Sequence, residues 1–309
     1  MLIGLDIGGT KIEGVIVTPN NPDVVFRLRV STPKSNYVDF LDAVKGVIND
    51  LIEKNEQLDI AAIQSIGIGC CGSINKTSGT MQGANILYLN GEDFLGDVQS
   101  VYRLPVALTN DANCLAISEF NTGAAKSAQS SCLAVILGTG CGSGVIINGD
   151  IVDGLHGLGG EIGHNPLPSF DTSVDGPNVT CYCGSENCIE SFLSGTGFER
   201  TWAVKHKPLP AAVIFEAYID GDKNAVAHVD HYTDCLARVL GSIINVIDPE
   251  VIVLGGGVSN QEIIYPLVQG KLSRYTFSKH VSTPIVKALH GDSSGVLGAA
   301  YLPLMKGLV

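Results

Sequence analysis

Basic residues are scarce in this sequence. It has 19 lysines and arginines against 31 aspartates and glutamates, which gives a formal net charge of −12 over 309 residues. A nucleic-acid surface needs clustered cations to neutralise the phosphate backbone, and the sequence shows no such cluster. Charged residues make up 16% of the chain and hydrophobic residues 45%, enough for substantial cores in two domains of ordinary size. The composition therefore predicts a globular protein without a nucleic-acid partner.

Long uninterrupted apolar runs are also missing. The most apolar long segment, residues 239–258, contains Asn245, Asp248, Pro249 and Glu250 as well as glycines, so it cannot cross a bilayer as one helix. The first residues show neither a basic n-region nor an apolar stretch that ends in a small-residue cleavage site. We therefore expect a soluble cytoplasmic protein with no membrane partner.

A disulfide framework is not indicated, because the nine cysteines are odd in number and scattered, as suits a reducing compartment. Only Cys181, Cys183 and Cys188 are closely spaced, and His164 lies upstream of them across a proline-containing loop. Three thiolates and one imidazole make a closed tetrahedral zinc site that leaves no position for a catalytic water. The alternative is three unrelated thiols and a surface histidine, but the tight spacing favours a structural Zn²⁺.

The pattern of a strand, a glycine-rich turn and a second strand occurs twice. Strands are predicted at residues 2–7 and 12–17 around the first turn, and at residues 133–137 and 144–147 around the second. Because the pattern recurs only once and far along the chain, it indicates two related domains rather than a solenoid.

Helical periodicity alternates with these strands. Apolar residues spaced as on one helix face cover residues 37–51 and 232–247, and a buried strand at 251–254 follows the second helix. Alternating helices and strands predict an α/β class, with two similar α/β lobes around a central cleft. We expect residues 1–118 with about 291–309 in a smaller lobe, and residues 119–290 in a larger lobe that carries the zinc loop.

The first turn has the features of a phosphate site. Asp6 stands at a strand end before Gly8, Gly9, Thr10 and Lys11. Glycines let the backbone approach a phosphate, successive N–H groups bind the anion, and the carboxylate can hold Mg²⁺. A plain hairpin turn would explain the glycines but not an acid inside an apolar strand, since an unpaired buried carboxylate is costly.

Other glycine-rich segments differ in what they indicate. The turn with Thr139 and Gly140 matches the first turn and supports phosphate binding. The run Gly255 to Gly257 suits an adenine or ribose, although a plain strand–helix connection is equally consistent with it. Residues 67–72 have the spacing of a dinucleotide fingerprint, but poor helix formers follow them, so we reject that function. The Walker pattern is absent.

Asp111 is the candidate catalytic base. Phosphoryl transfer to an alcohol needs a carboxylate that accepts the hydroxyl proton, and Asp111 stands in the run Asn110-Asp111-Ala112-Asn113. The alternative is that Asp111 only caps the following helix, a role that Asn110 can also fill.

These motifs together resemble the bacterial ROK family over nearly the whole chain. The resemblance rests on Asp6 to Lys11, Asn110 to Asn113, Gly138 to Gly140, Gly160 to His164 and Cys181 to Glu190. Within the family the chain looks most like the fructokinases, through segments such as Ala84-Asn85 and His164 to Pro168, with the N-acetylglucosamine kinases as near neighbours. One departure is Cys71-Gly72, where many members have Pro-Gly.

The resemblance implies an actin-like ATPase (ribonuclease H-like) fold and a homodimer. It implies that Asp111 is the general base of an ATP- and Mg²⁺-dependent sugar kinase and that His164 binds zinc with the three cysteines. The residues implied to contact the sugar are Gly72, Asn85, Asn110, Glu161, His164 and Glu190. We expect His164 to bind zinc through one ring nitrogen and a sugar hydroxyl through the other.

The expected reaction is phosphorylation of fructose, and of mannose as a second substrate, at the 6-hydroxyl. The alternative enzyme phosphorylates N-acetylglucosamine. A sugar-responsive repressor of the same family is disfavoured, because no helix-turn-helix segment precedes the first hairpin. A non-enzymatic actin-like scaffold would need neither the sugar-site acids nor the cysteines.

Overall fold

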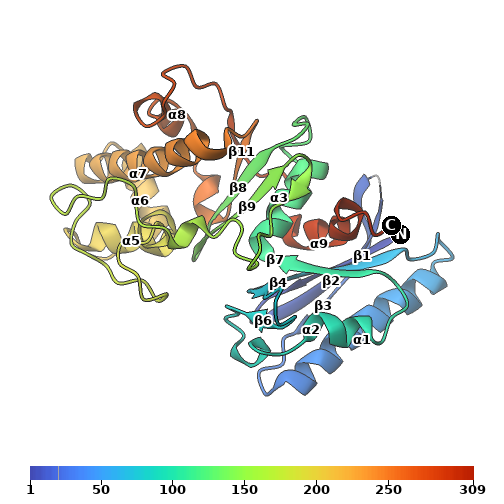
Figure 1. Ribbon diagram of the computed structural model, residues 1–309. Coiled ribbons are helices and arrows are strands. Elements are labelled where there is room, and N and C mark those ends of the chain that lie inside the picture. The colour runs from blue at the N-terminus through green and yellow to red at the C-terminus, as the bar shows by residue number, and fades with distance from the viewer. Residues whose placement is uncertain (20) are drawn as a thin grey trace. The chain divides into compact units, whose positions relative to one another are not determined.

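The computed structural model describes residues 1–19 and 21–309 and groups them into two compact units (Figure 1). The first unit contains residues 1–130, 144–160 and 289–309, and the second contains residues 131–143 and 161–288. Residues 119–130 and 144–160 thus group with the first unit, although the sequence placed them in the larger lobe. The expected domain boundaries stay a prediction, because the units are groups of residues in contact rather than parts shown to fold alone.

The first unit is built on a five-stranded sheet with the order β3-β2-β1-β4-β7. Strands β1, β2 and β3 are antiparallel, whereas β1, β4 and β7 run parallel, so their carboxyl ends lie at one edge. The elements of this unit are β1 (Leu2–Ile7), β2 (Lys11–Thr18), β3 (Asn21–Ser31), α1 (Tyr37–Gln57), β4 (Ser65–Cys70), β5 (Ser73–Ile74), β6 (Met81–Gln82), η1 (Leu87–Leu89), α2 (Phe94–Gln99), β7 (Val106–Asn110), α3 (Asp111–Asn121), β10 (Asp150–Ile151), η5 (Gly291–Ser293) and α9 (Ser294–Met305).

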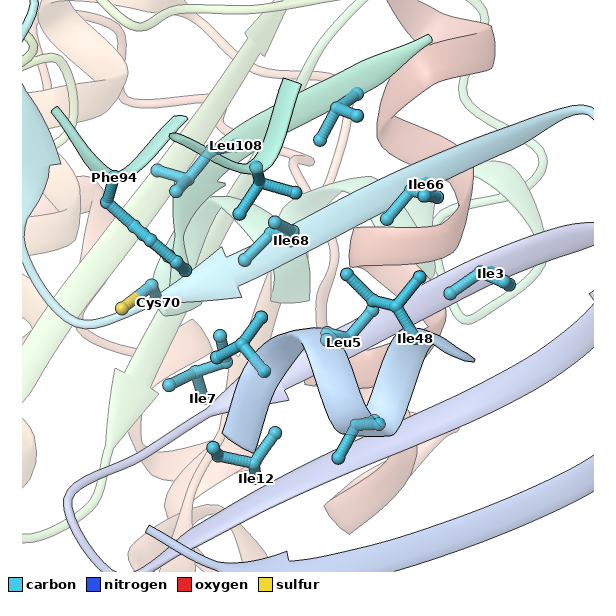
Figure 2. Close-up of a cluster of buried hydrophobic side chains, with 14 of the residues drawn as sticks. Ile3, Leu5, Ile7, Ile12, Ile48, Ile66, Ile68, Cys70, Phe94 and Leu108 are labelled. Atoms are coloured by element: carbon cyan, nitrogen blue, oxygen red, sulfur yellow. The ribbon is translucent and has the colours of Figure 1, made fainter. Parts of the chain in front are cut away.

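One face of this sheet packs on α1 and α2. Alternate residues of the central strands, such as Leu5, Ile68 and Leu108, point into a fully apolar layer with Ile48 of α1, and Figure 2 shows these side chains together. The helix predicted over residues 37–51 is confirmed and begins one residue after Asn36, whose side chain accepts a hydrogen bond from the N–H of Asp39.

The opposite face packs on α3 and α9 through glycines. A Cβ atom on Gly67 of β4 would lie 1.7 Å from the carbonyl oxygen of Ala299, and one on Gly4 of β1 would lie 2.2 Å from that of Val296. Residues 67–70 belong to β4, and residues 71–72 lead into the short strand β5 rather than into a helix, which confirms that residues 67–72 are no dinucleotide fingerprint.

The second unit is built on the parallel strands β8, β11 and β12 of a sheet with the order β10-β9-β8-β11-β12, of which β10 groups with the first unit. Strand β9 (Cys141–Ile147) begins in this unit and ends in the first. The other elements are β8 (Cys132–Leu137), η2 (Ile162–His164), α4 (Glu190–Leu193), α5 (Gly195–Ala203), α6 (Ala211–Ile219), α7 (Lys223–Ile247), β11 (Ile252–Gly255), η3 (Gly257–Asn260), α8 (Ile264–Gln269), η4 (Leu272–Arg274) and β12 (Ile285–Lys287).

Helix α7 and the residue at which it ends match the prediction from the sequence. The helix ends at Asp248, which adopts a left-handed conformation with φ of 42° immediately before Pro249.

Both predicted hairpins are confirmed as β1–β2 and β8–β9. Across the described ranges 1–19 and 21–309, no helix combines the length and the apolar character that a membrane crossing requires. The α/β class with two mixed sheets is therefore confirmed.

The close helix–sheet approach predicts that Gly67→Ala destabilises the protein by about 3 kcal/mol or more, because the methyl group overlaps the backbone of α9. Gly46→Ala is the matched control: Gly46 lies on the exposed face of α1 with free space around it, so the change is expected to stabilise by about 0.5–1 kcal/mol. Urea unfolding of both variants measures the difference, and equal stabilities would contradict the packing argument.

Candidate functional site

Asp6 and Asp111 lie at the same edge of the first sheet. Asp6 is the penultimate residue of β1, and Asp111 is the first residue of α3, directly after β7. The parallel register sets Asp6 beside Gly69, and Gly69 beside Thr109, so the ends of three strands are level. Asp6 also lies against the first turn of α9, where a Cβ atom on Gly295 would come within 3.0 Å of its carboxylate. The two predicted acids are thus brought together.

Asn110, not Asp111, caps helix α3. The side-chain oxygen of Asn110 accepts a hydrogen bond from the N–H of Asn113 at 2.7 Å. The Asp111 carboxylate accepts the adjacent N–H of Ala112 at 2.9 Å, and the residue is exposed. Because Asn110 fills the capping role, the alternative function considered for Asp111 is not needed, and its carboxylate is available for chemistry.

Both carboxyl groups have a raised pKa. Burial and then the nearby charge of Asp111 raise the pKa of Asp6 to about 6. Burial raises the pKa of Asp111, and the backbone N–H groups of Ala112 and Asp111 act against that shift. The pKa of Asp6 stays raised although the charges of Lys11 and Arg29 act against the shift, and two such crowded acids fit a divalent metal ion such as Mg²⁺, which prefers carboxylate oxygens. Asp6 is the residue that would hold it.

The turn after β1 is held by backbone and hydroxyl groups. The N–H of Gly8 donates to Lys11 O at 3.0 Å, and the hydroxyl of Thr32 donates to Gly8 O at 2.6 Å. Gly9 and Thr10 are exposed. Lys11 does not point freely toward a ligand, because its amine lies 3.0 Å from the carboxylate of Glu13.

Glu13 is a fully buried carboxylate that the sequence analysis missed. It lies beside Asp6 across β1 and β2 and binds Arg27 at 2.9 Å and Arg29 at 2.8 Å in addition to Lys11. Hydrogen bonds from Arg29 and Lys11 overcome the effect of burial and lower the pKa of Glu13. An acid within the apolar strand at 12–17 was the available signal, but its partners on β3 depend on strand pairing.

The predicted sugar residues of the first unit lie on two adjoining loops. Gly72 has φ of +82°, and a Cβ atom there would lie 2.6 Å from Gln82 O and 2.8 Å from Ala84 N, so only glycine fits. Asn85 is exposed and follows Ala84. Asn90 fixes this loop, because its side chain bonds both the N–H and the C=O of Ala84 at 2.9 Å. The sequence analysis gave Asn90 no role in the site.

The four predicted zinc ligands come together in the second unit. Nδ1 of His164 lies 3.7 Å from Sγ of Cys181, Sγ of Cys183 lies 3.6 Å from that of Cys188, and all four ligand atoms lie within 4.8 Å of one another. Sulfur atoms about 3.8 Å apart are what a tetrahedron with Zn–S bonds of about 2.3 Å requires. The arrangement therefore fits a structural zinc ion.

The protonation chemistry of the cluster also suits a metal. Backbone and hydroxyl hydrogen bonds from Ser185 lower the pKa of the Cys183 thiol to about 6, which favours the thiolate. The second ring nitrogen of His164, Nε2, lies 3.0 Å from the hydroxyl of the exposed Tyr182. The Tyr182 hydroxyl thus lies at the ring nitrogen that is expected to contact the sugar.

Glu190 links the zinc loop to the second glycine turn. It begins α4 two residues after Cys188, and its carboxylate accepts the N–H of Cys141 at 2.9 Å. A Cβ atom on Gly140 would lie 2.6 Å from the same carboxylate, so the turn needs glycine there. Glu161 directly precedes η2, and its carbonyl oxygen accepts the N–H of His164 at 3.3 Å.

A cavity of about 470 Å³ adjoins this turn within the second unit. Thr139 and Gly257 both line it, as predicted for a nucleotide site, whereas Gly140, Gly255 and Gly256 are not among its lining residues. Gly256 instead packs on β8, where a Cβ atom would lie 2.6 Å from Leu137 O. The remaining walls come from helices that the sequence analysis did not connect with a ligand, through Gly195, Thr196, Glu199, Ala211, Ala212 and Phe215.

The cysteine geometry predicts that Cys183→Ser lowers bound zinc from about one ion per chain to a small fraction of that, because a hydroxyl is a poor zinc ligand. Cys71→Ser, which changes a thiol outside the cluster, is expected to keep the metal. Elemental analysis of both purified proteins gives the stoichiometry, and full zinc content in Cys183→Ser would rule out this cluster as the site.

The raised pKa of Asp6 predicts that Asp6→Asn stabilises the protein by on the order of 2 kcal/mol at pH 8. In the wild type, the cost of the ionised carboxylate is present above about pH 6 and disappears as pH falls toward the unfolded-state value. The advantage of Asp6→Asn should therefore shrink at pH 4.5. Urea unfolding at the two pH values measures it, and a difference independent of pH would refute the assignment.

Comparison with known proteins identifies a family for the chain. The model of the ROK family matches residues 2–306. The chain is 38% identical over 312 residues to an N-acetyl-D-glucosamine kinase of Yersinia enterocolitica, covering 99% of this chain and 100% of that protein.

Two solved structures have the same fold. A ROK hexokinase from Thermus thermophilus superimposes with a TM-score of 0.84 at 27% identity and 99% coverage of both chains. A ROK family glucokinase from Streptomyces griseus, solved with glucose and AMPPNP, gives 0.75 at 26% identity and covers 97% of this chain and 98% of that one. This chain therefore belongs to the ROK family and is an ATP-dependent sugar kinase.

Proposed function

We propose that this protein transfers the γ-phosphoryl group of ATP to the 6-hydroxyl of N-acetyl-D-glucosamine. The observation that carries this choice of sugar is the 38% identity, over essentially the full length of both chains, to a protein named for that activity. Fructose, which the short motifs favoured, is supported by none of the relatives compared above. The choice between the two sugars therefore follows similarity along the whole chain.

The environment of the Asp111 carboxylate supports a role for Asp111 as the general base. Its carboxylate is exposed in the first turn of α3 and bonds neighbouring backbone N–H groups such as that of Ala112, so an oxygen lone pair can accept the hydroxyl proton. The raised pKa makes the carboxylate a better proton acceptor. Asn110 is fixed by its capping bond, which holds the adjacent sugar-binding position rigid.

Asp6 and the turn that follows it fit the phosphate groups. We infer that Asp6 holds Mg²⁺, which neutralises charge on the phosphates when it is bound. The exposed Gly9 and Thr10 offer backbone N–H groups to an anion. The cavity beside Thr139 and Gly257 is large enough for a nucleoside and is the proposed site for the adenosine of ATP.

The remaining sugar contacts are proposed for Gly72, Asn85, Glu161, His164 and Glu190. Carboxylates accept hydrogen bonds from sugar hydroxyls, and an imidazole nitrogen adds a donor or an acceptor. Zinc at Nδ1 of His164 would fix the ring, and Tyr182 must leave Nε2 before a sugar hydroxyl can take its place. The homodimer and the cytoplasmic location stay predictions.

A coupled assay with purified protein and Mg-ATP tests the proposed function across N-acetylglucosamine, fructose, mannose and glucose. We expect N-acetylglucosamine to have the highest kcat/KM. A higher value for fructose would overturn the choice of sugar while keeping the kinase, and no turnover of any sugar would overturn the function.

Asp111→Asn tests the mechanism in the same assay. Removing the proton acceptor is expected to lower kcat by about 100-fold to 10,000-fold with an unchanged melting temperature, because Asn110 still caps α3. Near wild-type turnover by a folded Asp111→Asn protein would exclude Asp111 as the base.

A further inference from the structure

The junction between β7 and α3, which carries Asn110 and Asp111, is closed by reciprocal hydrogen bonds. Asn110 accepts the N–H of Asn113, and the side-chain amide of Asn113 donates back to the hydroxyl of Thr109 at 2.9 Å. Thr109 and Asn113 are both buried. The side chains of Thr109 and Asn113, which precede and follow Asp111 in the chain, therefore bond to each other.

Thr109 and Asn113 both contact an acid from a distant part of the chain, Asp153. The hydroxyl of Thr109 donates to Oδ1 of Asp153 at 3.4 Å, and the amide of Asn113 reaches the same oxygen at 3.5 Å. The other oxygen, Oδ2, accepts a hydrogen bond from the amine of Lys306 at 2.6 Å. Lys306 thus holds the Asp153 carboxylate so that one oxygen faces the junction.

The loop that carries Asp153 also contacts the segment that follows Gly72. Nε2 of Gln82 donates to the carbonyl oxygen of His156 at 2.6 Å. Gly157 lies so close to β5 that a Cβ atom there would come within 2.6 Å of Ile74 O. Residues 153–157 therefore touch both segments of the first unit that carry proposed sugar contacts.

The surroundings leave the junction few other polar partners. A cavity of about 270 Å³ borders Thr109, Asn113, Asp153 and Lys306, and its other walls are mainly apolar. Among residues 1–19 and 21–309, the side-chain oxygen of Asn113 is one of few buried polar atoms that lack a hydrogen-bond partner. Loss of Asp153 would remove the carboxylate oxygen that Thr109 and Asn113 share and leave their two donor groups to find other partners.

We propose that Asp153, fixed by Lys306, is a positioning residue that holds Asn110 and Asp111 in the geometry needed for phosphoryl transfer. The inference rests on the proposed function for the role of these two residues, but not for the contacts themselves. Asp153 touches neither of them directly and acts through Thr109 and Asn113. A misplaced base slows transfer more than it weakens binding of the nucleotide, whose proposed cavity is lined by other residues.

Asp153→Ala and Lys306→Met test the proposal in the coupled assay with N-acetylglucosamine and ATP. For Asp153→Ala we expect kcat to fall about tenfold and the KM for sugar to rise, with the KM for ATP within twofold of wild type. Lys306→Met should have a smaller effect in the same direction. Lys287→Met, which removes an exposed ion pair with Glu262, is the matched control and should leave all three constants unchanged.

Hydrogen exchange followed by mass spectrometry supplies a second readout without turnover. Peptides that cover residues 107–116 should exchange faster in Asp153→Ala than in wild type, with an unchanged melting temperature. Wild-type kcat in Asp153→Ala, or equal effects on the KM values for sugar and ATP, would overturn the proposal. If wild-type protein phosphorylates no sugar, the proposed function fails, and exchange alone decides: equal rates in the two proteins would then overturn the positioning role.

Discussion

The close packing of α9 on the glycine-lined face of the first sheet is the contact that fixes the sheet edge where Asp6 and Asp111 lie. Gly4 and Gly67 let the helix backbone approach the strands to a distance that no side chain would allow. The same helix meets α3 at Gly298, where a Cβ atom would lie 1.8 Å from Cys114 O, and meets Asp6 at Gly295. One helix therefore sets the positions of both α3, which carries Asp111, and β1, which carries Asp6.

This packing also explains why the ionised form of Asp6 is disfavoured. Asp6 is enclosed by the first turn of α9 and by the neighbouring strands, so desolvation and the charge of Asp111 disfavour its ionised form. Glu13, the neighbour of Asp6 across the hairpin, is buried as well but has three cationic partners. Glu13 is therefore a carboxylate whose ionised form the fold stabilises, whereas the ionised form of Asp6 is disfavoured despite the nearby charges of Lys11 and Arg29.

The second unit obtains its geometry by a different route. Residues 161–190 form little regular structure, and four ligands from distant positions close the loop around one point. Asn187 adopts φ of 56° between Cys183 and Cys188, and its side chain accepts the N–H of Val179 at 2.9 Å. Because Glu190 follows directly, the metal cluster and the glycine turn at Gly140 are connected by one short helix and one hydrogen bond.

The sequence determined the features that depend on local pattern. Strand alternation, the two glycine turns, the capped helix at Tyr37 and the spacing of Cys181, Cys183 and Cys188 predicted the class, both hairpins and the metal cluster. Whether Asn110 or Asp111 caps α3 stayed open, because both side chains suit that position and only the folded geometry selects one.

Tertiary structure alone decided the contacts between residues far apart in sequence. Glu13 with Arg29, Thr109 with Asp153, and Asp153 with Lys306 each join segments whose meeting depends on strand order and helix packing. The pKa of Asp6 and the walls of the cavity beside Thr139 have the same origin. No local pattern encodes such contacts, since burial and charge at a site are sums over neighbours that only the folded chain brings together.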